Sequence, residues 1–93
     1  MLKDILADLQ KGLEKKSFDG SLKFDCGEDG VIVLADGTAS SDNRDTDCTL
    51  KLSTENLSKL LRGKLNAMTA IMMGQIKISG NPAVAMKLQS LLK

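Results

Sequence analysis

The sequence has 93 residues, of which 42% are hydrophobic, and a formal net charge of +1 at pH 7. This length suffices for one domain spanning residues 1–93 and is too short for two independent cores. Histidine, tryptophan and tyrosine are absent, which argues against histidine-based catalysis, the usual zinc ligand sets and an aromatic platform for nucleic acid. We therefore expect a protein with no catalytic residues, no metal site, no cofactor and no nucleic-acid partner.

The first segment is predicted to be a helix. Its apolar residues recur at helical spacing and draw one stripe along residues 2–16. The stripe consists of Leu2, Ile5, Leu6, Leu9 and Leu13. We expect this helix to cover an apolar surface of the protein and to carry no chemical site.

Three segments are predicted to be strands. Residues 22–26 and 48–52 alternate between apolar and polar side chains, which is typical of a strand with one buried face. Residues 31–35 are apolar on both faces and end at an Asp-Gly turn signal. Cys26 and Cys48 point inward in these patterns, and we expect both to be buried, reduced thiols.

A polar tract at residues 38–47 connects two of the strands. Its aspartates Asp42, Asp45 and Asp47 suggest a calcium loop, but such a loop needs glycine at its sixth position and glutamate at its twelfth. Counted from Asp42, those positions hold Asp47 and Ser53. We interpret the tract as a solvated loop.

Three helix starts can be assigned in the C-terminal half, and Asn66 caps the middle one, a short apolar helix. Ser53 is a suitable N-cap for a helix that ends at Gly63, and Asn81 followed by Pro82 begins a final helix that runs to about residue 92. Met86 lies opposite the apolar stripe of that last helix. It is therefore expected to be exposed or to face a second apolar surface.

The stretch between those helices is unusually rich in methionine. From Ala67 to Met73 only Thr69 is polar, so a helix there would be apolar almost all round, and we expect it to be covered on more than one side. Residues 75–79 then alternate as a strand with two inward isoleucines. Methionines at helical spacing are usually core filler, and the alternative is the soft wall of a ligand cavity.

Charge is distributed unevenly along the chain. Residues 1–50 contain 6 basic and 11 acidic side chains, whereas residues 51–93 contain 7 basic and 1 acidic. The basic half could attract an anionic membrane surface for transient contact. The alternative is an ordinary dipolar distribution that lets two layers of the protein attract each other.

The second half of the chain closely resembles the sterol carrier protein 2 (SCP-2) family of lipid-transfer domains. The most specific segments are Gly63-Lys64-Leu65-Asn66, Gly74-Gln75-Ile76-Lys77-Ile78-Ser79-Gly80-Asn81 and Ala85-Met86-Lys87-Leu88. The resemblance implies an α+β fold, in which helices and a five-stranded, mostly antiparallel sheet surround a hydrophobic tunnel. Because the patterns above give four strands, the fifth is expected within residues 36–42.

The resemblance also implies a function. We expect a non-enzymatic, cytoplasmic carrier that binds a sterol, fatty acid, fatty acyl-CoA or phospholipid. The predicted tunnel lining is Leu57, Leu60, Leu61, Met68, Ile71, Met72, Ile76, Ile78 and Met86. The alternative is an accessory module that presents the Met86 side of its last helix to a lipid- or quinone-metabolising enzyme.

Some positions depart from the family pattern. Ala67, Ile71 and Gln75 stand where the family often has proline, an aromatic residue and lysine. The loss of the aromatic side chain is expected to widen or reshape the tunnel. The sequence shows no signal peptide, no stretch long enough to span a membrane and no peroxisomal tripeptide at residues 91–93.

Overall fold

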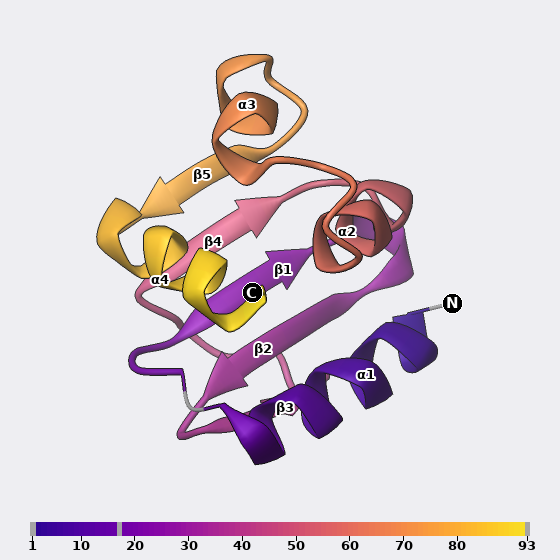
Figure 1. The fold of residues 1–93 in the computed structure, drawn as a ribbon, viewed down its shortest axis with the longest axis vertical. Coiled ribbons are helices and arrows are strands. Elements are labelled where there is room, and N and C mark those ends of the chain that lie inside the picture. Colours follow the sequence, from indigo (N-terminus) through magenta and orange to yellow (C-terminus); the bar gives the residue numbers. More distant parts are fainter. Residues whose placement is uncertain (1, 17, 93) are drawn as a thin grey trace.

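The computed structural model of the chain describes residues 2–16 and 18–92. In chain order, its elements are α1 (Leu2–Lys15), β1 (Leu22–Asp25), the 3₁₀ turn η1 (Gly27–Asp29), β2 (Val31–Ala35), β3 (Thr38–Ser40), β4 (Cys48–Lys51), α2 (Thr54–Leu61), α3 (Ala67–Met72), β5 (Lys77–Gly80) and α4 (Pro82–Leu92). Helices and strands therefore form the expected α+β arrangement (Figure 1).

The strands form one five-stranded sheet in the order β3-β2-β1-β4-β5. The β1–β4 pair is parallel and the other three pairs are antiparallel. The predicted fifth strand is confirmed as β3, inside residues 36–42. An alternation pattern could not reveal it, because it has 3 residues and only Ala39 among them is buried.

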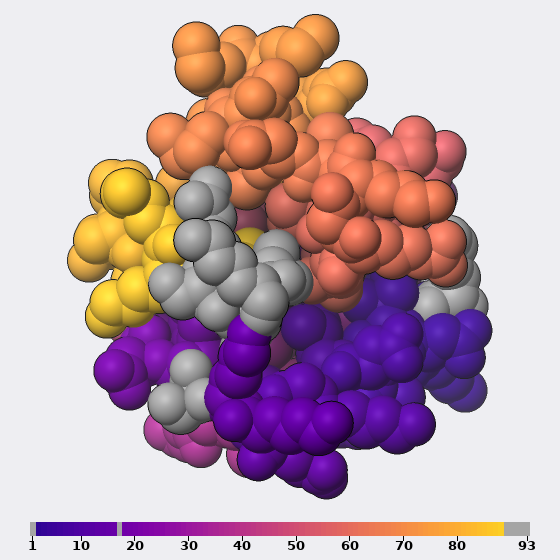
Figure 2. Space-filling view, in the orientation of Figure 1, coloured from indigo at the N-terminus to yellow at the C-terminus, as the bar shows by residue number. Residues whose placement is uncertain are grey.

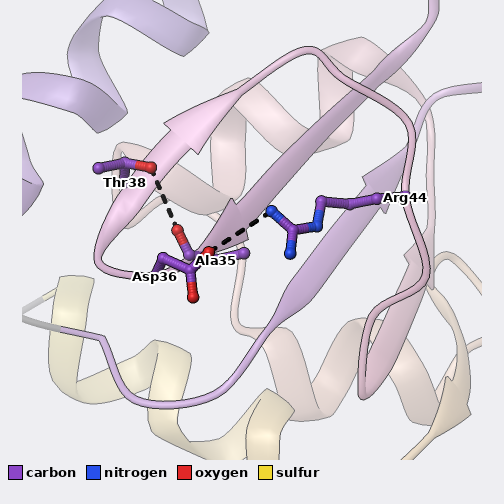
Figure 3. A network of polar contacts seen from close by, with 4 residues as sticks. All are labelled: Ala35, Asp36, Thr38 and Arg44. Carbon is purple, nitrogen blue, oxygen red and sulfur yellow. Dashed lines mark hydrogen bonds and ion pairs between the residues drawn. The ribbon is translucent and has the colours of Figure 1, made fainter.

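A tight turn joins β2 to β3. Asp36 and Gly37 both adopt left-handed backbone angles, with φ of 55° and 76°, as the Asp-Gly signal of a two-residue hairpin predicts. The Thr38 hydroxyl donates to the Ala35 carbonyl oxygen at 3.1 Å (Figure 3). Arg44, from the following loop, reaches the Asp36 carboxylate at 3.5 Å, and this exposed ion pair adds little stability.

One face of the sheet carries the core. Adjacent strands place their inward side chains in two rows, in which every member is buried except the partly buried Ile78. The first row is Ala39, Leu34, Leu22 and Cys48, and the second is Ile32, Phe24, Leu50 and Ile78. Figure 1 shows α1, α2 and α4 in front of the sheet. The opposite face is more polar toward β4 and β5, where Thr49 and Lys51 pair with Ser79 and Lys77.

The N-terminal helix covers the β2–β3 side of this core, as its stripe predicts. Ile5 and Leu9 are buried, and the remaining leucines of the stripe pack partly buried against the same cluster. Gln10 also donates its side-chain N–H to the Ala39 carbonyl oxygen at 3.0 Å. Helix α1 is therefore held to β3 by both packing and a hydrogen bond.

Polar side chains begin the C-terminal helices where the sequence predicts. The Ser53 hydroxyl accepts a hydrogen bond from the Asn56 backbone N–H at 3.1 Å, and the Asn81 side chain accepts one from the Ala83 N–H at 3.0 Å. These bonds satisfy backbone donors that the first helical turn leaves free. Both helix starts are confirmed.

The expectation for the methionine-rich helix is wrong. Helix α3 buries only Ala67 and Ala70, while Met72 and Met73 are 85% and 69% exposed. The helix has 6 residues and lies beyond the edge strand β5 (Figure 1), so one narrow face reaches the core. Apolar composition predicted coverage on several sides, whereas the position at the sheet edge allows it on one.

Strand β5 also begins later than residues 75–79 suggest. The backbone N–H groups of Gln75 and Ile76 both donate to the Ala70 carbonyl oxygen, at 2.8 and 3.2 Å. These two residues therefore close the end of α3, and the strand starts at Lys77. Ile76 is nonetheless fully buried and Ile78 partly buried, so both isoleucines point inward as predicted.

Candidate functional site

An apolar pocket of about 150 Å³ lies between α3, α4 and the β4–β5 strand pair. Its lining residues come from separate parts of the C-terminal half. They are Leu50, Ala67, Met68, Ile71, Ile78, Pro82, Ala85 and Met86. Every lining side chain is apolar, so the pocket offers a ligand contact with hydrocarbon and sulfur.

The floor of the pocket is a cross-strand pair. Leu50 in β4 and Ile78 in β5 are directly opposite each other in the antiparallel register. Both point to the helix-covered face, and Leu50 is fully buried. The floor is therefore fixed by backbone pairing between the two strands.

The two walls are turns of helices. On α3, Ala67 and Ile71 are one helical turn apart and line the same side of the pocket as Met68. On α4, Pro82 and Met86 have the same spacing. Each wall thus presents about one helical turn to the pocket.

Small residues keep the space open. Ala67 and Ala85 are 9% and 8% exposed, so each helix approaches the sheet with a methyl group where a leucine would fill the gap. An Ala-Met pair occurs on both walls, at 67–68 and at 85–86. In each pair the alanine faces inward and the methionine lies at the rim.

The rim is formed by flexible side chains. Met68 is 47% exposed and Met86 is 61% exposed, although both line the pocket. Figure 2 shows the orange residues of α3 protruding from one end of the molecule, beside the yellow residues of α4. The pocket is smaller than the roughly 300 Å³ of a typical ligand site, so a long ligand requires these methionines to change rotamer, which unbranched side chains do readily.

The structure separates the predicted tunnel residues into groups. Met68, Ile71, Ile78 and Met86 line the pocket together. Leu57, Leu60 and Ile76 are fully buried in the core, Leu61 is partly buried against it, and Met72 is 85% exposed outside the pocket. Their contact with a lipid stays a prediction.

Sequence reasoning missed half of the lining. Alternation along residues 48–52 places Leu50 in the core, and helical spacing does not single out Ala67, Pro82 or Ala85 as wall residues. The repeated Ala-Met pair is a signal that could have found the two alanines. A small residue before an exposed methionine on each of two facing helices marks where the helices leave a gap.

Two other hollows have polar groups in their walls. One of about 260 Å³ lies under the start of α1, where Leu6 and Ile32 are joined by the charged Lys3 and Asp29. A wider one, about 500 Å³, is lined by Asp36, Arg44 and further aspartates. The smaller pocket between α3 and α4 is the better candidate for an apolar ligand, because its lining includes no charged or hydroxyl side chain.

Both cysteines are buried free thiols, as predicted. Burial raises the pKa of the Cys26 thiol above its ordinary value of 9.0, and the nearby Asp29 carboxylate adds to that rise. The nearby Thr54 hydroxyl opposes the rise, and the hydrogen bond that this hydroxyl donates, at 2.6 Å, goes to the Asp29 carboxylate. Burial likewise raises the pKa of Cys48, against a smaller opposing effect of the Ala85 backbone. Both thiols are therefore protonated and unreactive near neutral pH.

Within residues 2–16 and 18–92, no three His, Cys, Asp or Glu side chains gather closely enough to hold a metal ion. The helices of this described part are all too short or too polar to cross a bilayer.

Family comparison assigns the fold to a known group. The model of a family described as the SCP-2 sterol transfer family matches residues 2–93. Sterol carrier protein 2 of Gallus gallus is 43% identical over 64 residues, which cover 66% of this chain and 12% of the chicken protein. Peroxisomal multifunctional enzyme A of Dictyostelium discoideum is 32% identical over 88 residues, which cover 95% of this chain and 18% of that enzyme. The chain thus spans a small part of these relatives.

Solved structures share the overall α+β fold of this chain. The sterol carrier protein domain 2 of Helicoverpa armigera superposes with a TM-score of 0.73 at 28% identity, over 96% of this chain and 83% of that one. Sterol carrier protein 2 of Aedes aegypti in complex with palmitate gives a TM-score of 0.79 over 96% and 91% of the two chains. At 16% identity, the Aedes structure supports the fold alone.

Proposed function

Because this chain belongs to the SCP-2 sterol transfer family, we propose that it is a lipid carrier that holds one acyl chain in the pocket between α3 and α4. The observation that carries the proposal is the uniformly apolar lining of that pocket. Burial of hydrocarbon contributes about 0.8 kcal/mol for each CH₂ removed from water. A fatty acid can therefore bind there without a specific polar partner, while its carboxylate stays at the methionine rim.

The shape of the pocket favours a flexible chain over a rigid ring system. Its volume of about 150 Å³ admits part of an alkyl chain, and the remainder can follow as the rim methionines change rotamer. A sterol nucleus would need the whole opening at once. The Aedes aegypti protein of the same fold is solved in complex with palmitate, and we propose a fatty acid or its acyl-CoA ester as the ligand class here.

We propose that the carrier leaves its ligand chemically unchanged. The pocket lining contains no acid, base or nucleophile, and the raised pKa of each buried cysteine keeps its thiol neutral. Some relatives are far longer proteins, among them the Dictyostelium discoideum enzyme. In such a longer protein, we propose that the segment matching this chain delivers lipid to the catalytic domain.

Ligand exchange requires a donor membrane. Residues 56–93 contain six basic side chains and no acidic one, and we propose that this segment draws the carrier to anionic lipid surfaces.

A filled pocket tests the carrier proposal. Ala85→Leu should occupy the space under α4 and lower the uptake of a fluorescent fatty acid by about tenfold or more, because the acyl chain loses its buried site. Ala83→Leu is the matched control, since Ala83 is exposed on the same helix. Thermal unfolding of both variants would show that they remain folded.

The direct measurement is native mass spectrometry of the purified protein, followed by analysis of the lipid extract. We expect a lipid that co-purifies with the protein. Its mass should stay the same when the complex is incubated, because the carrier does not modify it. A wild-type protein with no co-purifying lipid and no uptake would overturn the proposal. Equal uptake by Ala85→Leu and Ala83→Leu would move the site elsewhere in the protein.

A further inference from the structure

We propose that the exposed methionines of α3 and α4 form a membrane-docking surface, which places the mouth of the pocket directly against an anionic bilayer. This inference rests on the proposed carrier function and names the face, the inserting side chains and the partner. The methionine surface consists of Met68, Met72, Met73 and Met86. With it in the bilayer, a lipid could pass between membrane and pocket without crossing water.

The exposure of these methionines is the first observation. They are the large hydrophobic side chains that stand out as exposed in the described part of the chain, at 47%, 85%, 69% and 61%. Three of them belong to α3 or to the residue that caps it, and α3 protrudes from one end of the molecule (Figure 2). Clustered apolar exposure of this kind marks an interaction site.

The charge around the methionine surface selects the partner. Lys64 comes just before the Asn66 cap of α3, and Lys87 follows Met86 on α4. No acidic residue occurs after Glu55, and Glu55 itself is paired with Lys59 at 3.5 Å. An apolar patch with lysines next to it in the chain complements anionic headgroups above an acyl layer. Asp47 is the acidic residue that the fold brings to the start of α4, where its backbone carbonyl accepts a hydrogen bond from the Asn81 N–H at 2.8 Å.

The edge of the sheet adds a further cation. Lys77 in the edge strand β5 lies directly opposite Lys51 in β4. Like charges in such a cross-strand pair repel each other, and neither lysine takes part in an ion pair among the described residues. Both side chains lie on the face of the sheet opposite the pocket, so their charge adds to the positive potential of this end of the molecule and not to the border of the methionine surface.

The methionine surface and the pocket share two side chains. Met68 and Met86 belong both to the pocket lining and to the exposed surface. Insertion of their thioether ends into the acyl layer would draw both side chains away from the pocket mouth. The same contact that holds the carrier on the membrane would therefore open its site.

Vesicle binding tests the docking surface. Flotation of the full chain is measured with vesicles of phosphatidylcholine and phosphatidylserine in equal parts and with pure phosphatidylcholine vesicles. We expect binding to the mixed vesicles that weakens with added salt. Met72→Gln with Met73→Gln should lower the partition coefficient about tenfold, because two apolar side chains no longer insert. These two methionines lie outside the pocket lining, so uptake of a fluorescent fatty acid without vesicles should be unchanged.

A pair of charge-matched variants locates the cationic contact. Lys64→Gln with Lys87→Gln should lower the partition coefficient about 25-fold, since each lysine near the surface contributes about a fivefold factor. Lys11→Gln with Lys15→Gln removes the same charge from α1 and should have little effect. A larger loss in the α1 variant would overturn the proposal and assign docking to α1.

The remaining outcomes separate the two proposals. Wild-type protein that takes up fatty acid but does not bind mixed vesicles overturns the docking surface and leaves the carrier function standing. Vesicle binding without any lipid uptake supports the surface and contradicts the carrier. A homodimer in sedimentation analysis that dissociates on Met72→Gln with Met73→Gln would show that a second copy covers the methionines, which also overturns the docking surface.

Discussion

Helices α1 and α3 are both rich in apolar residues, yet they are used in opposite ways. Helix α1 has 14 residues and buries Ile5 and Leu9 against the sheet. Helix α3 has 6 residues, buries two alanines and exposes its methionines. The comparison teaches that large side chains face inward where a helix stabilises the fold. On α3, which borders the pocket, two alanines face inward and the methionines outward.

The largest difference is expected when one side chain is truncated on each helix. Leu9→Ala should lower the free energy of unfolding by about 3 kcal/mol, because it leaves a cavity in the core. Met72→Ala should change it by less than about 0.5 kcal/mol, since that side chain is exposed. Urea denaturation of both variants measures the contrast. Similar losses in the two variants would show that α3 is packed as tightly as α1.

A second contrast concerns how α3 and β5 are joined to the sheet. Gly80 has φ of +92°, and a Cβ atom there would meet the Asp47 carbonyl oxygen and come within 3.1 Å of the Cys48 Cα. Gly80→Ala should therefore cost about 2 kcal/mol or more. Gly74→Ala, at a φ of +79° with nothing within 4 Å, should cost about 1 kcal/mol from backbone strain alone. Equal thermal shifts would contradict the close approach at Gly80.

The stability of helix α3 can be lowered without changing its apolar residues. Its N-cap Asn66 accepts a hydrogen bond from the Thr69 N–H at 3.1 Å. Asn66→Ala should cost about 1 kcal/mol, and Asn66→Ser should restore most of it. Because α1 does not share this cap, amide hydrogen exchange should increase in α3 and stay unchanged in α1. Uniform acceleration in both helices would mean that they open together.

The smallest effect, absent at neutral pH, comes from the two buried thiols. Burial raises the pKa of Cys26 and Cys48 above 9.0. Each buried neutral thiol therefore contributes its full stability below pH 9, and that contribution is lost as pH rises through the folded-state value. The free energy of unfolding should fall above pH 9 in the wild type and fall less steeply in Cys26→Ala with Cys48→Ala. Identical slopes would refute the raised pKa values.

Local chemistry in the sequence predicted most of the fold. Caps such as Ser53 and Asn81, the Asp36-Gly37 turn and the stripe of α1 act over a few residues, and all are found where expected. The orientation of α3 was not predictable in this way. Its composition gives every side similar hydropathy, and only the location beyond β5 decides that the alanines face inward.

The pocket was predicted in part for a related reason. Met68, Ile71, Ile78 and Met86 were expected at a lipid site because of family resemblance, and they do line one pocket. The sequence does not reveal the alanines that create its space. The cavity exists because small side chains on two different helices leave a gap between them, and that gap depends on how the helices pack. Spacing along one helix contains no information about that gap.

The single parallel pairing in the sheet has a consequence for how the protein is made. Strand β1 pairs with β4 across the whole β2–β3 hairpin, so the first part of the chain can complete a three-stranded meander before β4 has been synthesised. The parallel ladder closes a long loop and is expected to form late and slowly. The pocket side, which depends on β4 and β5, would thus be the last to appear on the ribosome. Leu50 and Ile78, which these two strands bury, would remain uncovered longest in a nascent chain, which makes that half the region most exposed to aggregation during synthesis.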